Sequence, residues 1–167
     1  MKRLSKDKYY LNIAKEIAQR STCLRTHIGA VIVRDSQIIA TGYNGAPRKT
    51  KSCLERKECL RNKLNIPHGQ RYEICRSVHA EQNAIINAAR AGVSLLNGDM
   101  YIWGEDNEYN LMNAFPCFIC KKMIINANLK RIICSLKNGK IKIFKLSRWI
   151  NDWQVGDILD DKEQYGK

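Results

Sequence analysis

The stretch GAVIVRDSQIIAT, residues 29–41, contains the pattern that decides the fold. Its two runs of β-branched and small residues, 29–34 and 37–41, are joined by Asp35 and Ser36. Runs of this composition around a short polar connection predict a β-hairpin. The sequence Gly-Tyr-Asn-Gly at 42–45 then ends the second strand.

Helical patterns lie on both sides of this hairpin. Residues 6–20 carry apolar side chains at helical spacing, with Ser5 as a candidate cap, and residues 79–90 are strongly helical. Two strands followed by alternating helices and strands indicate an α/β fold, a mixed sheet with helices packed on its faces. The pattern does not determine the strand order. The later elements expected are strands at 100–103, 131–135 and 140–146, a helix at 117–127 with Pro116 in its first turn, and a helix at 147–153.

One segment interrupts this alternation. Residues 46–78 are polar, charged and cysteine-bearing, and we interpret them as an insertion with a short helix near 54–64. No linker or repeat divides the chain, so residues 1–167 are expected to form a single domain. The acidic tail at 157–163 is expected to be poorly ordered.

The composition favours a globular cytoplasmic protein. Hydrophobic residues make up 44% of the 167, which is ordinary for a packed domain. No apolar run approaches the ~20 residues needed to cross a bilayer, and no apolar region follows the basic N-terminus as in a signal peptide. The net charge of +13 favours a polyanionic partner, either a nucleotide phosphate or a nucleic acid, although a solvated basic surface accounts for it equally well.

The candidate chemistry lies at the start of two predicted helices. His79-Ala80-Glu81 opens one, and Pro116-Cys117-Phe118-Ile119-Cys120 opens the other. Cys117 and Cys120 are three residues apart and share a helix face. With His79 they give zinc three protein ligands and an open fourth position, which is the catalytic arrangement, whereas structural sites are closed by four. Helix N-termini favour thiolates, and Glu81 is placed to carry protons without binding the metal.

The pattern H-x-E…P-C-x-x-C is the signature of zinc nucleobase deaminases. With it, the chain resembles the deoxycytidylate (dCMP) deaminases of the cytidine deaminase superfamily over about residues 8–135. Besides the two zinc motifs, the resemblance rests on four stretches: 29–33, 41–47, 79–85 and 99–102.

The resemblance implies a three-layer α-β-α sandwich with a central five-stranded mixed sheet. It implies zinc-dependent hydrolysis of dCMP to dUMP and ammonia, a homo-oligomer (often a hexamer) and regulation by dCTP and dTTP. By position, Asn44 is expected to contact the sugar and base, and the backbone around Ala80 and Phe115 to orient the pyrimidine. Arg25, Arg48 and Lys51 flank the expected nucleotide loop and are candidates for binding the 5′-phosphate, with a solvated charge as the alternative for each.

A second cysteine group lies outside the catalytic motifs. The resemblance implies that a structural zinc binds Cys23 and Cys53, and Cys59 and Cys75 could complete four thiolate ligands, with His68 as a competing ligand. The alternative is separate buried or free thiols. Of the remaining residues, we expect Cys134 in the core, His27 packed without a metal, and aromatic residues 101, 103, 149 and 153 in the core or in subunit contacts.

Three other functions share parts of this pattern. A tRNA adenosine deaminase has the same zinc motifs and would explain the basic charge, but the turn at 42–45 and the insertion fit nucleotide deaminases better. A non-catalytic, zinc-stabilised, competence-associated protein would not need Glu81. A flavin-pathway deaminase usually has a longer spacing between its paired cysteines.

Overall fold

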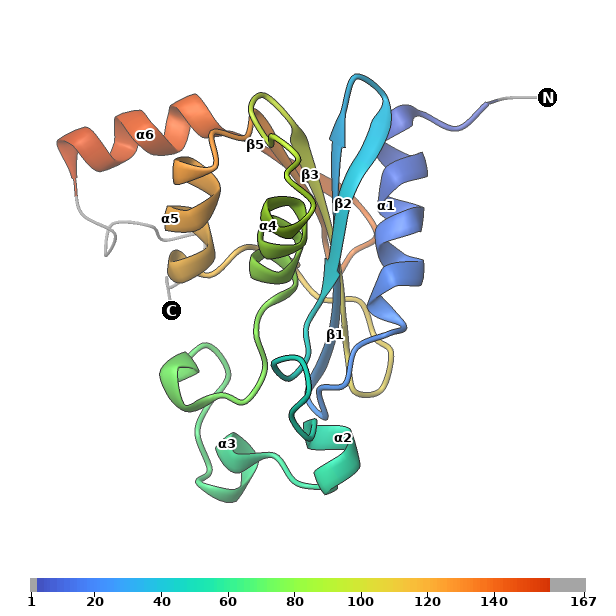
Figure 1. Ribbon diagram of the computed structural model, residues 1–167, viewed down its shortest axis with the longest axis vertical. Helices are drawn as coiled ribbons and strands as arrows, with labels where there is room; N and C mark the ends of the chain where they lie inside the picture. Colours follow the sequence, from blue (N-terminus) through green and yellow to red (C-terminus); the bar gives the residue numbers. More distant parts are fainter. Residues whose placement is uncertain (1–2, 157–167) are drawn as a thin grey trace.

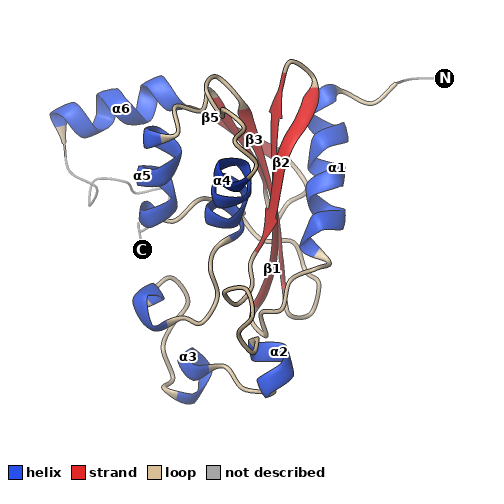
Figure 2. Ribbon diagram, in the orientation of Figure 1, coloured by secondary structure: helices blue, strands red, loops and turns tan. Residues whose placement is uncertain are grey.

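A computed structural model gives the fold over residues 3–156, so the tail at 157–163 lies outside the described residues. The chain folds around one five-stranded sheet with strand order β2-β1-β3-β4-β5. Helix α1 covers one face of the sheet, and α4, α5 and α6 lie on the other (Figure 1). Figure 2 shows the same three layers by secondary structure. The predicted three-layer α-β-α sandwich is therefore confirmed.

The bounds of the elements agree closely with the periodicity of the sequence. The strands are β1 (Thr26–Arg34), β2 (Gln37–Tyr43), β3 (Asp99–Asp106), β4 (Arg131–Ser135) and β5 (Ile141–Lys145). The helices are α1 (Lys6–Ala18), α2 (Cys53–Arg56), α3 (Leu60–Lys63), α4 (Ala80–Arg90), α5 (Phe118–Asn126) and α6 (Leu146–Val155), with a 3-10 turn η1 at Tyr72–Ile74.

The sheet is mixed, as expected. Strand β1 is antiparallel to both β2 and β3, β3 is parallel to β4, and β4 is antiparallel to β5. A parallel pair needs a crossover between its strands, and here the crossover contains α5. This connection places the start of α5 on the same side of the sheet as the start of α4 (Figure 1).

Two apolar cores hold the layers together. Between α1 and the sheet, residues such as Leu11, Val31 and Ile133 are buried. Between the sheet and the other helices, the core includes Ile102 and the predicted core residue Cys134, both essentially inaccessible to solvent. Burial of this apolar surface is the main stabilising contribution to such a fold.

Two glycines set how closely the helices approach the sheet. A Cβ on Gly42 of β2 would lie 2.3 Å from the carbonyl oxygen of Ala80 in α4, and a Cβ on Gly29 of β1 would lie 2.1 Å from that of Ala14 in α1. The helix faces that meet them are themselves lined by alanine. The small residues on both sides therefore let α4 pack directly against β2, and α1 directly against β1.

Three sequence predictions need correction in detail. The helix near 54–64 is two single turns, α2 and α3, because Lys57 has a left-handed backbone with φ of 55° that ends the first turn. The strand predicted at 100–103 extends over all of β3. Pro116 precedes the N-cap of α5 and is not in its first turn, because Cys117 still has an extended backbone.

Within residues 3–156, none of the helices combines the length and apolar character that a membrane span requires.

Candidate active site

His79 is held at the N-terminus of α4. Its backbone is extended and it acts as the N-cap of the helix. The backbone N–H of His79 donates a hydrogen bond of 2.9 Å to Oε1 of Gln82, which fixes the start of the helix. Glu81 follows in the first turn and is buried, with 5% of its surface exposed. The first turn of α4 therefore presents an imidazole and a carboxyl group together.

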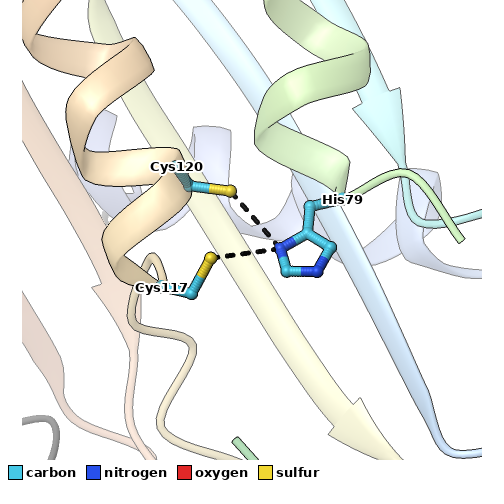
Figure 3. Close-up of side chains that lie close together, drawn as sticks. All are labelled: His79, Cys117 and Cys120. Atoms are coloured by element: carbon cyan, nitrogen blue, oxygen red, sulfur yellow. Dashed lines mark hydrogen bonds between the residues drawn. The ribbon is translucent and has the colours of Figure 1, made fainter. Parts of the chain in front are cut away.

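Cys117 and Cys120 are presented in the same way by α5. Cys117 is the N-cap, and Cys120 lies one turn further on the same helix face. Both sulfur atoms lie 3.4 Å from Nδ1 of His79 (Figure 3). The two loops that lead into α4 and α5 thus bring together three residues separated by about forty positions in the sequence.

These three atoms fit a zinc ion. The ligand atoms of His79, Cys117 and Cys120 all lie within 4.8 Å of one another. Ordinary Zn–N and Zn–S bonds at a tetrahedral angle place nitrogen and sulfur about 3.5 Å apart, close to the spacing found. One imidazole and two thiols are also the donor set that zinc prefers. The predicted ligand set is thus brought together, and Glu81 stands beside it.

Electrostatics prepare this group to bind a cation. Cys120 donates a hydrogen bond to the sulfur of Cys117, and this contact, with the nearby imidazole, lowers the pKa of Cys117. The same contact and burial raise the pKa of Cys120, so the pair loses its first proton more easily than its second. A metal cation would favour the loss of the second proton as well.

The carboxyl group of Glu81 is suited to carry a proton. Burial raises its pKa above the ordinary value, and the neighbouring His79 partly offsets this effect. A raised pKa brings a carboxyl group closer to neutral pH, where an efficient general acid and base must titrate. Glu81 is close enough to Cys120 to interact with its thiol, so it lies directly beside the metal-binding group.

A single cavity connects these groups with the predicted substrate residues. It is lined by His79, Glu81 and Cys117, and also by Asn44, Ala80 and Phe115. The side chain of Asn44 is buried and already bonded: Oδ1 accepts from the N–H of Ile28 at 2.9 Å, and Nδ2 donates to the carbonyl of Thr26 at 2.9 Å. Asn44 therefore shapes the cavity wall by holding the start of β1, and its contact with substrate stays a prediction.

Of the three residues predicted to bind the 5′-phosphate, the structure places only one in the lining of the cavity. Arg25 lines the cavity, and its Nη1 donates to the carbonyl of Ile66 at 3.0 Å. Arg48 is exposed and bonds to the side chain of Asn87 at 2.7 Å, outside the lining of the cavity. Lys51 is exposed and also absent from that lining. Two lining arginines, Arg61 and Arg76, were missed, because nothing in the sequence distinguishes them from other basic residues of the insertion.

The second cysteine group lines the far part of the same cavity. Burial, followed by the proximity of Cys23, Cys59 and Cys75, raises the pKa of Cys53. These four thiols are therefore neighbours, but among residues 3–156 the group placed closely enough to hold a metal ion is His79, Cys117 and Cys120, and the four thiols do not form a second such group. His68 also lines the cavity, and its pKa is lowered by burial and by two arginines.

The other predicted residues lie away from the metal group. His27 packs against Tyr109, with ring centroids 4.9 Å apart. Trp149, a residue of α6, is buried in the core on that side of the sheet, and Tyr101 is buried between the sheet and α1. Trp103 and Trp153 are partly buried.

The fold and the site together define a protein of the α-β-α type with three candidate metal ligands at two helix N-termini. Comparison with known proteins identifies the family. The sequence pattern of the family described as "Cytidine and deoxycytidylate deaminase zinc-binding region" matches residues 4–136. The chain belongs to this family.

Individual relatives agree with this assignment. The deoxycytidylate deaminase of Mycobacterium phage D29 is 33% identical over 138 residues, which cover 80% of this chain and 96% of the relative. That of Schizosaccharomyces pombe is 32% identical over 131 residues, 78% of this chain, but the chain spans only 37% of its length. The crystal structure of dCMP deaminase from cyanophage S-TIM5 in apo form superimposes with a TM-score of 0.56 at 25% identity, covering 78% of this chain and 82% of that one.

Proposed function

We propose that the protein is a zinc-dependent hydrolase that converts dCMP and water to dUMP and ammonia. The observation that carries the proposal is the group of His79, Cys117 and Cys120 at two helix N-termini, with the buried carboxyl group of Glu81 beside it. The phage D29 relative, which the chain covers almost completely, is a deoxycytidylate deaminase and supports the choice of substrate.

The residues of the chain have distinct parts in this reaction. His79, Cys117 and Cys120 would hold the zinc ion, which when bound supplies a Lewis acid that makes water a nucleophile at neutral pH. Glu81 takes a proton from the attacking water and delivers it to N3 of the cytosine ring as oxygen bonds to C4. Glu81 then takes the remaining proton from the hydroxyl group on C4 and transfers it to the amine; the C4=O bond of dUMP forms as the C4–N bond breaks, and ammonia leaves.

A substrate panel tests the proposal. The zinc-loaded protein is incubated with dCMP, CMP, deoxycytidine and tRNA, and the release of ammonia is measured. We expect the highest kcat/KM on dCMP. Turnover confined to tRNA would replace the proposal by an adenosine deaminase, and no turnover on any substrate would favour a non-catalytic protein of the same fold.

We further propose that a second, structural zinc ion binds Cys23, Cys53, Cys59 and Cys75. The mutual proximity of these thiols in the insertion supports it, as does the sparse apolar core of this segment, in which Leu54, Leu60 and Leu64 are exposed. Metal analysis should give two zinc ions per chain and one in Cys53→Ser. A value of one in the wild type would reject the second site.

We also propose a cytoplasmic homo-oligomer that responds to dCTP and dTTP, with the hexamer often found in the family it resembles as the expected form. The family resemblance is the support for each of these points. Light scattering would give the subunit number, and kinetics with each nucleotide would test regulation. A monomer with unaltered kinetics would reject both.

A further inference from the structure

The C-terminal helix α6 contributes a tryptophan to the core beside the active site. Trp149 is 6% exposed and packs in the apolar core between the sheet and the helices on the active-site face. Helix α6 lies on the same face of the sheet as α4 and α5 (Figure 1). It also lies beyond residues 4–136, which match the family pattern. Any role of Trp149 therefore has to be inferred from its contacts in this chain.

Three aromatic rings, which we call the aromatic row, run from α6 to the wall of the cavity. The centroid of the Trp149 ring lies 5.4 Å from that of Phe144 in β5, at an interplanar angle of 41°. Phe144 in turn meets Phe115 edge-on, with centroids 5.3 Å apart at an angle of 87°. Phe115 lines the cavity together with His79 and Cys117. Aromatic pairs prefer such tilted and edge-on geometries, so each ring of the row restricts the position of the next.

Trp149 is itself held in place from the side of α5. The ammonium group of Lys121 lies 5.1 Å from the centroid of the Trp149 ring, and Lys121 is buried, with 3% of its surface exposed. A cation–π contact of this kind is stronger in a desolvated place than at the surface. The backbone N–H of Lys121 donates a 2.8 Å hydrogen bond to the carbonyl of Cys117, within the first turn of α5. The aromatic row is thus anchored at the end remote from the cavity.

The segment that carries Phe115 depends on side-chain contacts for its position. Residues 112–117 form neither helix nor strand. The backbone N–H of Ala114 donates to the carbonyl of Ser135 at 3.0 Å, which fixes the chain just before Phe115. The orientation of the Phe115 ring is set by its packing on Phe144. Side chains of loops that line a site are commonly positioned in this way by the rigid elements beneath them.

We propose that Trp149 is a positioning residue that acts through Phe144 on the ring of Phe115, and so fixes the wall expected to orient the pyrimidine. The inference rests on the proposed function and deepens it, because this wall belongs to the same site. Within residues 3–156, Trp149 is not among the residues that line the cavity, so it acts on the substrate through its neighbours. The C-terminal helix would therefore control the affinity for the base from behind the wall.

The test is a double-mutant cycle of Trp149→Ala and Phe115→Ala, with Trp149→Phe as the conservative variant and Leu11→Ala as the matched control. Leu11 is buried in the core on the other face of the sheet, so its truncation lowers stability away from the cavity. For each zinc-loaded protein, KM and kcat are measured on dCMP, and calorimetry gives Kd for dUMP without turnover. All measurements are made at a temperature where thermal unfolding shows every variant to be folded.

In Trp149→Ala we expect KM for dCMP and Kd for dUMP to rise by about 10-fold, the order lost with one aromatic pair, with kcat nearly unchanged. Phe115→Ala should weaken binding at least as much. The double variant should match Phe115→Ala alone, because Trp149 acts through that ring. Trp149→Phe should keep most of the affinity, and Leu11→Ala all of it. Additive losses in the double variant, or a fall in kcat with unchanged KM in Trp149→Ala, overturn the inference.

Two further outcomes keep the test decisive. If Trp149→Ala does not fold, Trp149→Leu, which retains apolar volume without a ring, replaces it in the cycle, and full affinity in that variant overturns the inference. If the wild type deaminates no cytosine compound, the proposed function fails, yet dUMP binding with the same non-additive pattern still supports the role of Trp149. A wild type that does not bind dUMP overturns the inference.

Discussion

Replacing Gly42 by alanine tests whether the close packing of α4 on β2 sets the geometry of the active site. A Cβ at this position would lie 2.3 Å from the carbonyl oxygen of Ala80 and 2.3 Å from the backbone nitrogen of Ala84. Both are backbone atoms of the helix, so no flexible side chain can move aside. The added methyl group must displace the first turns of α4 relative to the sheet.

The size of the displacement follows from ordinary contact distances. Van der Waals contact of a Cβ begins at 3.4 Å, so the helix has to move by about 1 Å. His79 and Glu81 flank Ala80 and would move with it. Because a catalytic group misplaced by about 1 Å can cost about 100-fold in rate, we expect kcat/KM of Gly42→Ala to fall by that order. Overpacking should also lower the free energy of unfolding by about 1–3 kcal/mol.

Gly29→Ala is the matched control. A Cβ there would lie 2.1 Å from the carbonyl oxygen of Ala14 and 2.6 Å from the nitrogen of Ala18, so α1 moves on the face of the sheet opposite the site. We expect a similar loss of stability with kcat nearly unchanged. Steady-state kinetics on dCMP and urea unfolding are measured at a temperature where both variants are folded. Equal activity losses in the two variants, or full activity in Gly42→Ala, would refute the reasoning.

Three further predictions concern the metal group and the sheet. Glu81→Gln should keep its zinc, measured by metal analysis, while kcat falls by at least about 100-fold, because a positioned acid–base group contributes that much or more; an active variant would remove Glu81 from the mechanism. His79→Ala should lose the catalytic zinc and all turnover, and a chelator should reproduce this loss reversibly in the wild type; full activity in the chelated protein would contradict a metal-dependent reaction. Arg131→Met removes a hydrogen-bonded ion pair to Asp99 with an N–O distance of 2.6 Å. The free energy of unfolding, measured in urea, should fall by about 1–3 kcal/mol. An unchanged value would mean that this ion pair makes no net contribution to stability.

The elements that could be predicted are those whose signal is local. The hairpin of β1 and β2 follows from composition and one turn, and β4 has the predicted bounds, 131–135. The metal group was predictable for the same reason. Each half of it is a short motif, H-x-E at 79–81 and P-C-x-x-C at 116–120, that belongs to a known signature of zinc nucleobase deaminases. Only the folded structure shows that the two halves, about forty positions apart in the sequence, come into contact.

The sheet order could not be predicted because strand pairing is decided by contacts that are distant in the sequence. The antiparallel pairing of β1 with β3 joins residues more than sixty positions apart, with Gly29 opposite Trp103. Nothing in either strand alone selects this partner. The same holds for the glycines: Gly29 looks like an ordinary small residue of a strand until α1 is seen to pack 2.1 Å from its absent Cβ.

The structure of the insertion was the least predictable part of the chain from sequence alone. Its two short helices lack a regular apolar face, because Leu54, Leu60 and Leu64 are all exposed, so periodicity could not give their bounds. Its order comes instead from polar links to the rest of the chain, such as the bond of Arg25 to Ile66. Among 29 lysines and arginines, residue type cannot separate a solvated charge from a buried one. Among the described residues, Arg61 stands out because it is buried and its Nε has no hydrogen-bond partner, a property that arises only when the insertion folds over the cavity.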